Sequence, residues 1–154
     1  MHTGDAMLAT DSISLAGVAR PPATSAADSD AAIGLIRALY DAFGRGDILD
    51  VFSTLTQDVV IEQTTELPWG GTWRGMDDAR EFFLRLMQRV DSRVEVQEVF
   101  AAGSRVIVIG RTRGMARRTG TAFDVRVVHV FELRGGKVSR FETYVDTPAM
   151  QAVL

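Results

Sequence analysis

The sequence predicts an α+β domain in which helices pack on one face of a curved antiparallel sheet. Apolar residues recur at helical spacing early in the chain: Ile33, Ile36, Leu39, Tyr40 and Phe43. After residue 93 the apolar period switches to two, and short glycine-containing segments separate the apolar runs. Helices followed by long strands are typical of an α+β fold.

We divide the chain near residue 28. Residues 1–28 are rich in Ala, Ser, Thr and Gly, contain Pro21-Pro22, and show no sustained apolar period. This composition is typical of a flexible N-terminal extension. Residues 29–154 are long enough to bury one core and are expected to form a single domain.

Three helices are expected before the main sheet. Ser29 or Asp30 can cap the first, which ends near Gly44. Asp47 caps the second, residues 48–55. The third follows two acidic residues at 77–78, which favour a helix N-terminus, and it presents one apolar stripe: Phe82, Phe83, Leu86, Met87 and Val90.

The remaining apolar segments are expected to be strands. The first covers residues 59–66 and is followed by a loop that contains Pro and Gly, residues 67–71. The others form a meander of antiparallel hairpins over residues 94–101, 105–118, 122–134 and 138–145.

Composition excludes several functional classes. A hydrophobic content of 46%, a charged content of 24% and a net charge of -3 are those of an ordinary globular protein. No apolar run approaches the roughly 18 residues of a membrane span. The arginines have no interleaved aromatic residues, so nucleic-acid binding is not expected. Without cysteine and with only two histidines, no metal site is expected. No secretory signal is recognisable, so a cytoplasmic location is expected.

One histidine falls inside an apolar strand. In segment 122–134 the alternation places His129 on the same face as Val127 and Phe131, which is the inward face. A Gly-Gly turn joins this segment to a strand that Asp146 closes. A His/Asp pair in apolar surroundings can transfer protons, because burial and neighbours shift both pKa values. The alternatives are a structural core histidine and an aspartate that caps a C-terminal helix.

Five segments resemble a known family: residues 43–47, 58–62, 68–75, 128–131 and 144–147. Together they resemble the SnoaL-like branch of the nuclear transport factor 2-like superfamily, over roughly residues 30–154. The resemblance implies a cone-shaped α+β barrel with one internal pocket, and a homodimer formed through the sheet. Members include polyketide cyclases, ketosteroid isomerases, limonene-type epoxide hydrolases, dehydratases and non-catalytic binding domains, so the fold is better determined than the reaction.

The catalytic residues of two of these enzyme classes are only partly present in this chain. The general-base aspartate of ketosteroid isomerases falls on Gln63, while their protonated oxyanion aspartate falls on His129. The Arg-x-Asp pair of limonene-type hydrolases falls on Gly110 and Thr112. The SnoaL-type cyclase pattern, an inward histidine followed by a carboxylate on the last strand, fits His129 and Asp146 best.

We therefore expect a cofactor-independent acid/base enzyme of the cyclase or isomerase type, with His129 and Asp146 as the catalytic pair. Four residues are expected to contact substrate: Tyr40, Gln63, Trp69 and Tyr144. The substrate would be largely apolar with a few oxygens, such as a polyketide, a terpenoid or an aromatic compound. The alternatives are a non-catalytic binding or dimerisation domain, and an epoxide hydrolase or dehydratase.

Overall fold

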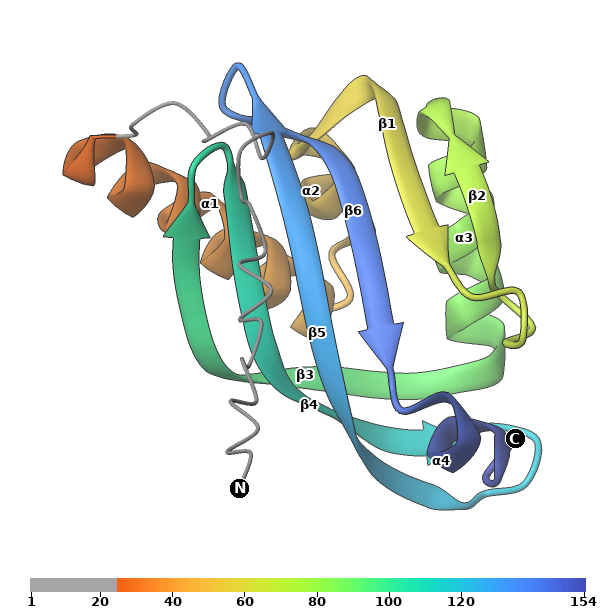
Figure 1. Ribbon diagram of the computed structural model, residues 1–154. Helices are drawn as coiled ribbons and strands as arrows, with labels where there is room; N and C mark the ends of the chain where they lie inside the picture. Colours follow the sequence, from red (N-terminus) through yellow and green to blue (C-terminus); the bar gives the residue numbers. More distant parts are fainter. Residues whose placement is uncertain (1–24) are drawn as a thin grey trace, which may run out of the picture.

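The computed structural model describes residues 25–154, which form a six-stranded, strongly curved open sheet with helices on one face (Figure 1). The helices are α1 Ala26–Gly44, α2 Ile48–Ser53, α3 Gly75–Arg89 and α4 Thr147–Gln151. The strands are β1 Leu55–Gln63, β2 Gly71–Arg74, β3 Val90–Ala102, β4 Arg105–Ala116, β5 Ala122–Arg134 and β6 Lys137–Val145. The predicted α+β class is confirmed. Most of the predicted extension lies outside the described residues.

The strand order is β2-β1-β6-β5-β4-β3. Strands β3 to β6 form the predicted antiparallel meander, but β1 pairs with β6 in parallel. The sequence prediction missed this parallel pair and also missed β2, which begins at the end of the predicted loop. Strand β1 begins earlier than predicted, because Leu55 already pairs with Val138 of β6, and it ends at Gln63 rather than at residue 66.

The sheet bends most visibly along β3 and β4 (Figure 1). A register shift between Val96 and Glu98 marks a bulge in β3, opposite Gly110 of β4. Bulges of this kind increase the bend and twist of a strand pair. A Cβ atom on Gly110 would lie 2.2 Å from the carbonyl oxygen of Glu95, so a side chain here would force the two strands apart.

The helix caps place α1 and α2 at the start of the fold. Ser25, rather than the predicted Ser29 or Asp30, caps α1 by accepting a hydrogen bond from the Asp28 amide at 3.1 Å. Asp47 caps α2, as predicted, by accepting from the Asp50 amide at 3.2 Å. Both caps satisfy amides that would otherwise lack a partner within the helix.

Helices α1 and α3 cover the inner face of the sheet, α1 against β3 and β4 and α3 against β1, β2 and β3. The core between these layers contains Ile36 and Leu39 of α1, Phe82 and Phe83 of α3, and the inward residues of the strands. In β5 the inward phase predicted for Val127, His129 and Phe131 is confirmed by their burial. Within residues 25–154, no helix is long and apolar enough to span a membrane.

Candidate functional site

A cavity of about 90 Å³ lies between the helices and the concave face of the sheet. Its lining is mainly aliphatic and aromatic, with a few polar side chains: Tyr40, Gln63, Trp69, Ser92, Thr112, His129 and Thr143. Apolar cavities with a few placed polar groups are typical of small-molecule sites. Among residues 25–154, neither Asp nor Glu lines this cavity.

A polar groove of about 380 Å³ lies beside the cavity, at the ends of β1 and β6. Gln63, Thr143 and Val145 line both spaces. The cavity alone is small for a drug-sized ligand, since such sites usually measure roughly 300–1,000 Å³. The groove lies on the other side of these three shared residues.

The hydrogen bond between Tyr40 and His129 is the main polar contact in the cavity. The Tyr40 hydroxyl, from α1, lies 2.5 Å from Nδ1 of His129, from β5. His129 is 6% exposed, and its ring also meets the Phe141 ring edge to face at a centroid distance of 4.9 Å. Helix α1 and strand β5 are thus linked directly across the core.

Burial keeps both partners of this hydrogen bond uncharged. It lowers the pKa of His129 from 6.5 to about 3 and raises the pKa of Tyr40 above its usual value. A phenol is the better donor of the two groups and an unprotonated imidazole nitrogen the better acceptor. We therefore assign the proton of this bond to Tyr40, which leaves Nε2 of His129 as an N–H donor.

Gln63 and Trp69 form a second polar contact. The Trp69 indole Nε1 donates to Oε1 of Gln63 at 2.8 Å, and the carbonyl oxygen of Trp69 accepts from the Trp73 indole at 3.2 Å. The loop that carries Trp69 is tight at Gly70, where a Cβ atom would lie 1.7 Å from the Thr64 carbonyl oxygen. Trp69 is 2% exposed, so its side chain is fixed in the wall of the cavity.

Neighbouring strands bring the polar residues into one row. His129 of β5 pairs with Thr143 of β6, and β6 pairs with β1 up to Glu62 and Glu142, one residue before Gln63 and Thr143. With strands about 4.8 Å apart, these side chains lie side by side across the cavity wall. Thr143 was not predicted from the sequence, because the simple hairpin register places Glu142 opposite His129 and only the register shift between Glu132 and Leu133 brings Thr143 there.

Asp146 does not lie beside His129, contrary to the prediction. Its carboxylate caps α4 by accepting from the Ala149 amide at 3.2 Å, and its backbone amide donates to the Arg126 carbonyl oxygen. Asp146 is exposed and is not part of the cavity wall. These contacts agree with the alternative stated above, in which Asp146 caps a C-terminal helix. The hydrogen-bond partner of His129 is Tyr40.

A bulge in β6 explains this difference. The register of the β5–β6 hairpin shifts between Glu132 and Leu133, so that Ser139 of β6 is an extra residue. Because side chains alternate along a strand, one extra residue exchanges the two faces. Beyond the bulge, Thr143 and Val145 line the cavity.

Tyr144 lies on the outer side of the sheet after this exchange. It is 57% exposed, lines the outer groove, and donates a hydrogen bond to Glu142 at 2.7 Å. This bond and that from Arg140 hold the pKa of the Glu142 carboxyl below its usual range. Tyr144 therefore reaches a ligand only where that ligand extends into the groove.

Nothing in the described part of the chain brings three His, Asp or Glu side chains together as a metal site requires. Tyr40 and His129 are the titratable groups that line the cavity within residues 25–154. The arrangement can hold a neutral molecule and donate hydrogen bonds to it.

The low pKa of His129 predicts that stability falls as the pH falls. The unfolded chain binds a proton near pH 6.5 whereas the folded chain does not until about pH 3, so protonation favours unfolding between these values. We expect the free energy of unfolding to drop by about 2 kcal/mol between pH 7.5 and 5 because of this residue. Urea denaturation at both pH values should show the drop, and His129→Gln should remove it. An equal drop in the two proteins would contradict the assignment.

The cap formed by Asp146 predicts a stability effect that depends on hydrogen bonding rather than on charge. Asp146→Ala should lower the free energy of unfolding by about 1 kcal/mol, whereas Asp146→Asn and Asp146→Ser should keep most of the stability. Urea denaturation measures the three variants. If Asp146→Asn is as stable as the natural protein but loses ligand conversion, the carboxylate has a catalytic role that its capping contact does not explain.

Comparison with known proteins identifies the family of this chain. A model of the SnoaL-like domain matches residues 36–141. An NTF2-like protein of unknown function from Burkholderia pseudomallei is 28% identical, with a TM-score of 0.75 over 80% of this chain and 96% of that chain. TerC, co-crystallised with polyporic acid, is 28% identical, with a TM-score of 0.74 over 80% of this chain and 97% of its own.

An epoxide hydrolase from Mycobacterium tuberculosis, of the limonene-type (LEH-like) group, is 25% identical, with a TM-score of 0.66 over 82% of this chain and 90% of that chain. The family match covers most of the region from α1 to β6. The chain belongs to the SnoaL-like domain family.

Proposed function

We propose that this protein is a cofactor-independent enzyme of the cyclase or isomerase type, which polarises a carbonyl group of a largely apolar small molecule. The observation that carries the proposal is the hydrogen bond between Tyr40 and His129 inside an apolar cavity. Donors fixed in a water-poor site stabilise negative charge that develops on a substrate oxygen. The cytoplasmic location and the lack of a cofactor stay predictions.

The role of His129 in this proposal is that of a donor. A histidine with a pKa of about 3 is a weak base at neutral pH, but its neutral N–H can polarise a carbonyl oxygen. Tyr40 fixes the tautomer through Nδ1 and aims Nε2–H at the substrate. This replaces the His129–Asp146 pair expected from the sequence.

The absence of a carboxylate from the cavity wall, as far as residues 25–154 form it, limits the reaction. A substrate that enolises easily, such as a 1,3-dicarbonyl compound, already carries an acidic proton that water can remove. The enzyme then holds its enol against a second carbonyl and stabilises the oxygen that becomes negative. Intramolecular ring closure and keto–enol isomerisation both fit these conditions.

The substrate class that we propose rests on the residues that line the cavity and on one similar protein of solved structure. The wall is mainly apolar with a few polar side chains, among them the row that contains Gln63, Thr143 and His129, and such a lining suits a polyketide, a terpenoid or an aromatic compound with a few oxygens. TerC, which shares the fold and 28% of its residues with this chain, was co-crystallised with polyporic acid. That match supports a cyclic ligand with oxygen substituents.

A non-catalytic binding domain is the second candidate, and the lack of an acidic residue in the cavity wall of the described chain favours it. The similarity to the epoxide hydrolase keeps hydrolysis as a third candidate. However, the positions of the hydrolase Arg-x-Asp pair hold Gly110 and Thr112, and neither can activate water as a base.

The donor role of His129 predicts a flat pH profile. On an aromatic ketone or 1,3-diketone found by a screen for conversion, kcat/KM should change little between pH 5.5 and 8, since His129 stays neutral throughout. His129→Phe should lower kcat/KM by about 10²–10³, and Tyr40→Phe by less. Leu49→Ala, on the exposed face of α2, is the control with unchanged activity.

A bell-shaped profile with a limb at pH 6–7 that His129→Phe abolishes would show a general base instead. Ligands that bind without conversion would favour the binding domain.

We also propose that two copies of the chain associate through the outer face of the sheet. An apolar strip crosses this face in two paired rows: Phe100, Ile107 and Val130 in one, Ile109, Val128 and Tyr144 in the other. Phe100 is 44% and Tyr144 57% exposed. Exposed apolar patches with polar rims are typical of interaction sites.

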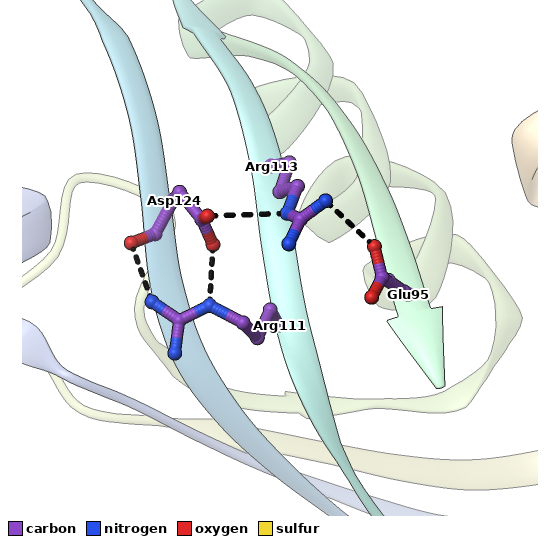
Figure 2. Close-up of polar contacts among 4 residues, drawn as sticks. All are labelled: Glu95, Arg111, Arg113 and Asp124. Atoms are coloured by element: carbon purple, nitrogen blue, oxygen red, sulfur yellow. Dashed lines mark hydrogen bonds and ion pairs between the residues drawn. The ribbon is translucent and has the colours of Figure 1, made fainter. Parts of the chain in front are cut away.

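One side of this strip carries charges that are already paired. Arg111 contacts Asp124 at 2.5 Å, and Arg113 lies between Asp124 at 3.2 Å and Glu95 at 2.8 Å (Figure 2). Paired charges create little repulsion when the same surface of a second copy approaches, as a two-fold interface requires. A second copy is therefore the partner that we propose.

Val128→Glu tests this association, because it places a charge at the centre of the strip. We expect sedimentation at micromolar concentration to give a dimer for the natural chain and a monomer for Val128→Glu. Leu49→Glu adds the same charge to α2, away from the sheet, and should leave the dimer intact. A natural chain that sediments as a monomer, or an equal effect of the two variants, would reject the proposal.

A further inference from the structure

We propose that Trp69 is a positioning residue that fixes the amide of Gln63 with its NH₂ group toward the ligand, and that the site thereby selects ligands whose oxygens accept hydrogen bonds. The inference rests on the proposed small-molecule site but does not require turnover. It assigns Trp69 a role in specificity beside the direct substrate contact predicted from the sequence, since Trp69 also lines the cavity.

The hydrogen-bonding chemistry of the indole determines the orientation of the amide. An indole N–H can only donate, so the atom of Gln63 that lies 2.8 Å from it must be the carbonyl Oε1. The flipped amide would place N–H groups of both residues face to face. Because Trp69 is only 2% exposed, water has little access to replace the lost acceptor. The orientation of Gln63 is thus determined by its partner.

Trp69 is itself held in place by the surrounding loop. Its carbonyl oxygen accepts from Trp73, and backbone bonds from Leu67 to Thr64 and from Gly70 to Leu67 close two turns around it. The close approach of Gly70 to Thr64 leaves no space for another residue type there. A rigid donor of this kind is what a positioning role requires.

The amide nitrogen of Gln63 is then directed away from Trp69. Within the described chain this nitrogen has no hydrogen-bond partner, and Gln63 lines both the cavity and the groove beside it. Nε2 of His129 likewise has no partner within residues 25–154. Because both residues line the ligand space, we infer that these two nitrogens offer their hydrogens to it.

These two donors lie at the ends of the row that crosses β1, β6 and β5, with Thr143 between them. The strand spacing separates the backbones of Gln63 and His129 by roughly 10 Å, which leaves space for about one ring between the side chains. A ring with acceptor oxygens on two edges satisfies both donors. A hydrocarbon ring of the same shape leaves both unpaired, which is the condition under which polar sites discriminate strongly.

Equilibrium dialysis with two probes of the same shape tests the inference: 1,4-naphthoquinone, which has two acceptor oxygens, and naphthalene, which has none. We expect the natural protein to bind the quinone about tenfold or more tightly than naphthalene. Gln63→Glu keeps an acceptor for Trp69 but offers no donor, and it should abolish this preference. Trp69→Phe should reduce the preference to about threefold or less while changing naphthalene binding little.

Leu49→Ala is the control. It shortens an exposed side chain of α2 that lines neither the cavity nor the groove, so the preference for the quinone should remain. If Trp69 were only structural, Trp69→Phe would weaken both probes equally, and that result would overturn the inference. So would a natural protein without preference or without binding of either probe. Failure of the proposed catalysis is a separate result, because the ratio of affinities is measured without conversion.

Discussion

The contents of the site depend on one irregularity in the sheet, the extra residue Ser139 in β6. Before this bulge Val138 is the inward residue, and after it Phe141, Thr143 and Val145 face the cavity. Since the hydrogen bonds of the β5–β6 ladder fix the register, the phase of every later residue follows from this single insertion. An unbulged strand would turn the Glu142 carboxylate toward His129 and place Thr143 on the outer face.

The same exchange of faces keeps the charged side chains of β6 out of the cavity. Glu142 lies on the outer face, where Arg140 binds it at 2.9 Å and binds Glu62 at 2.6 Å. The inner face keeps the uncharged groups of Tyr40, His129, Gln63 and Thr143. A buried carboxylate beside His129 would stabilise the imidazolium, so its absence leaves desolvation as the dominant influence on the pKa of His129. The neutral state of the site is thus a consequence of strand phase.

Sequence periodicity predicted the parts of the fold in which the pattern is unbroken. Strand β5 has no bulge opposite β4, so simple alternation correctly placed His129 inside. In β6 the same reasoning failed after Ser139, because a bulge leaves no clear signal in a pattern of polar and apolar residues. The parallel pairing of β1 with β6 and the bond between Tyr40 and His129 join residues 80 or more positions apart, and both depend on how whole elements dock. The bond from Trp69 to Gln63 spans six residues, yet it depends on the turn geometry at Gly70.

Helix α4 connects Asp146 to the site indirectly. Met150 of α4 is 3% exposed and lines the cavity, and Gln151 donates to the Glu66 carbonyl oxygen at 3.0 Å, which joins α4 to the loop of Trp69. Asp146 caps this five-residue helix, which is too short to be stable without its packing and its cap. Loosening the cap therefore loosens one wall of the cavity and the loop that holds Trp69. In such an arrangement a carboxylate that follows the last strand influences ligand binding without touching the ligand, because the helix that it caps completes the wall.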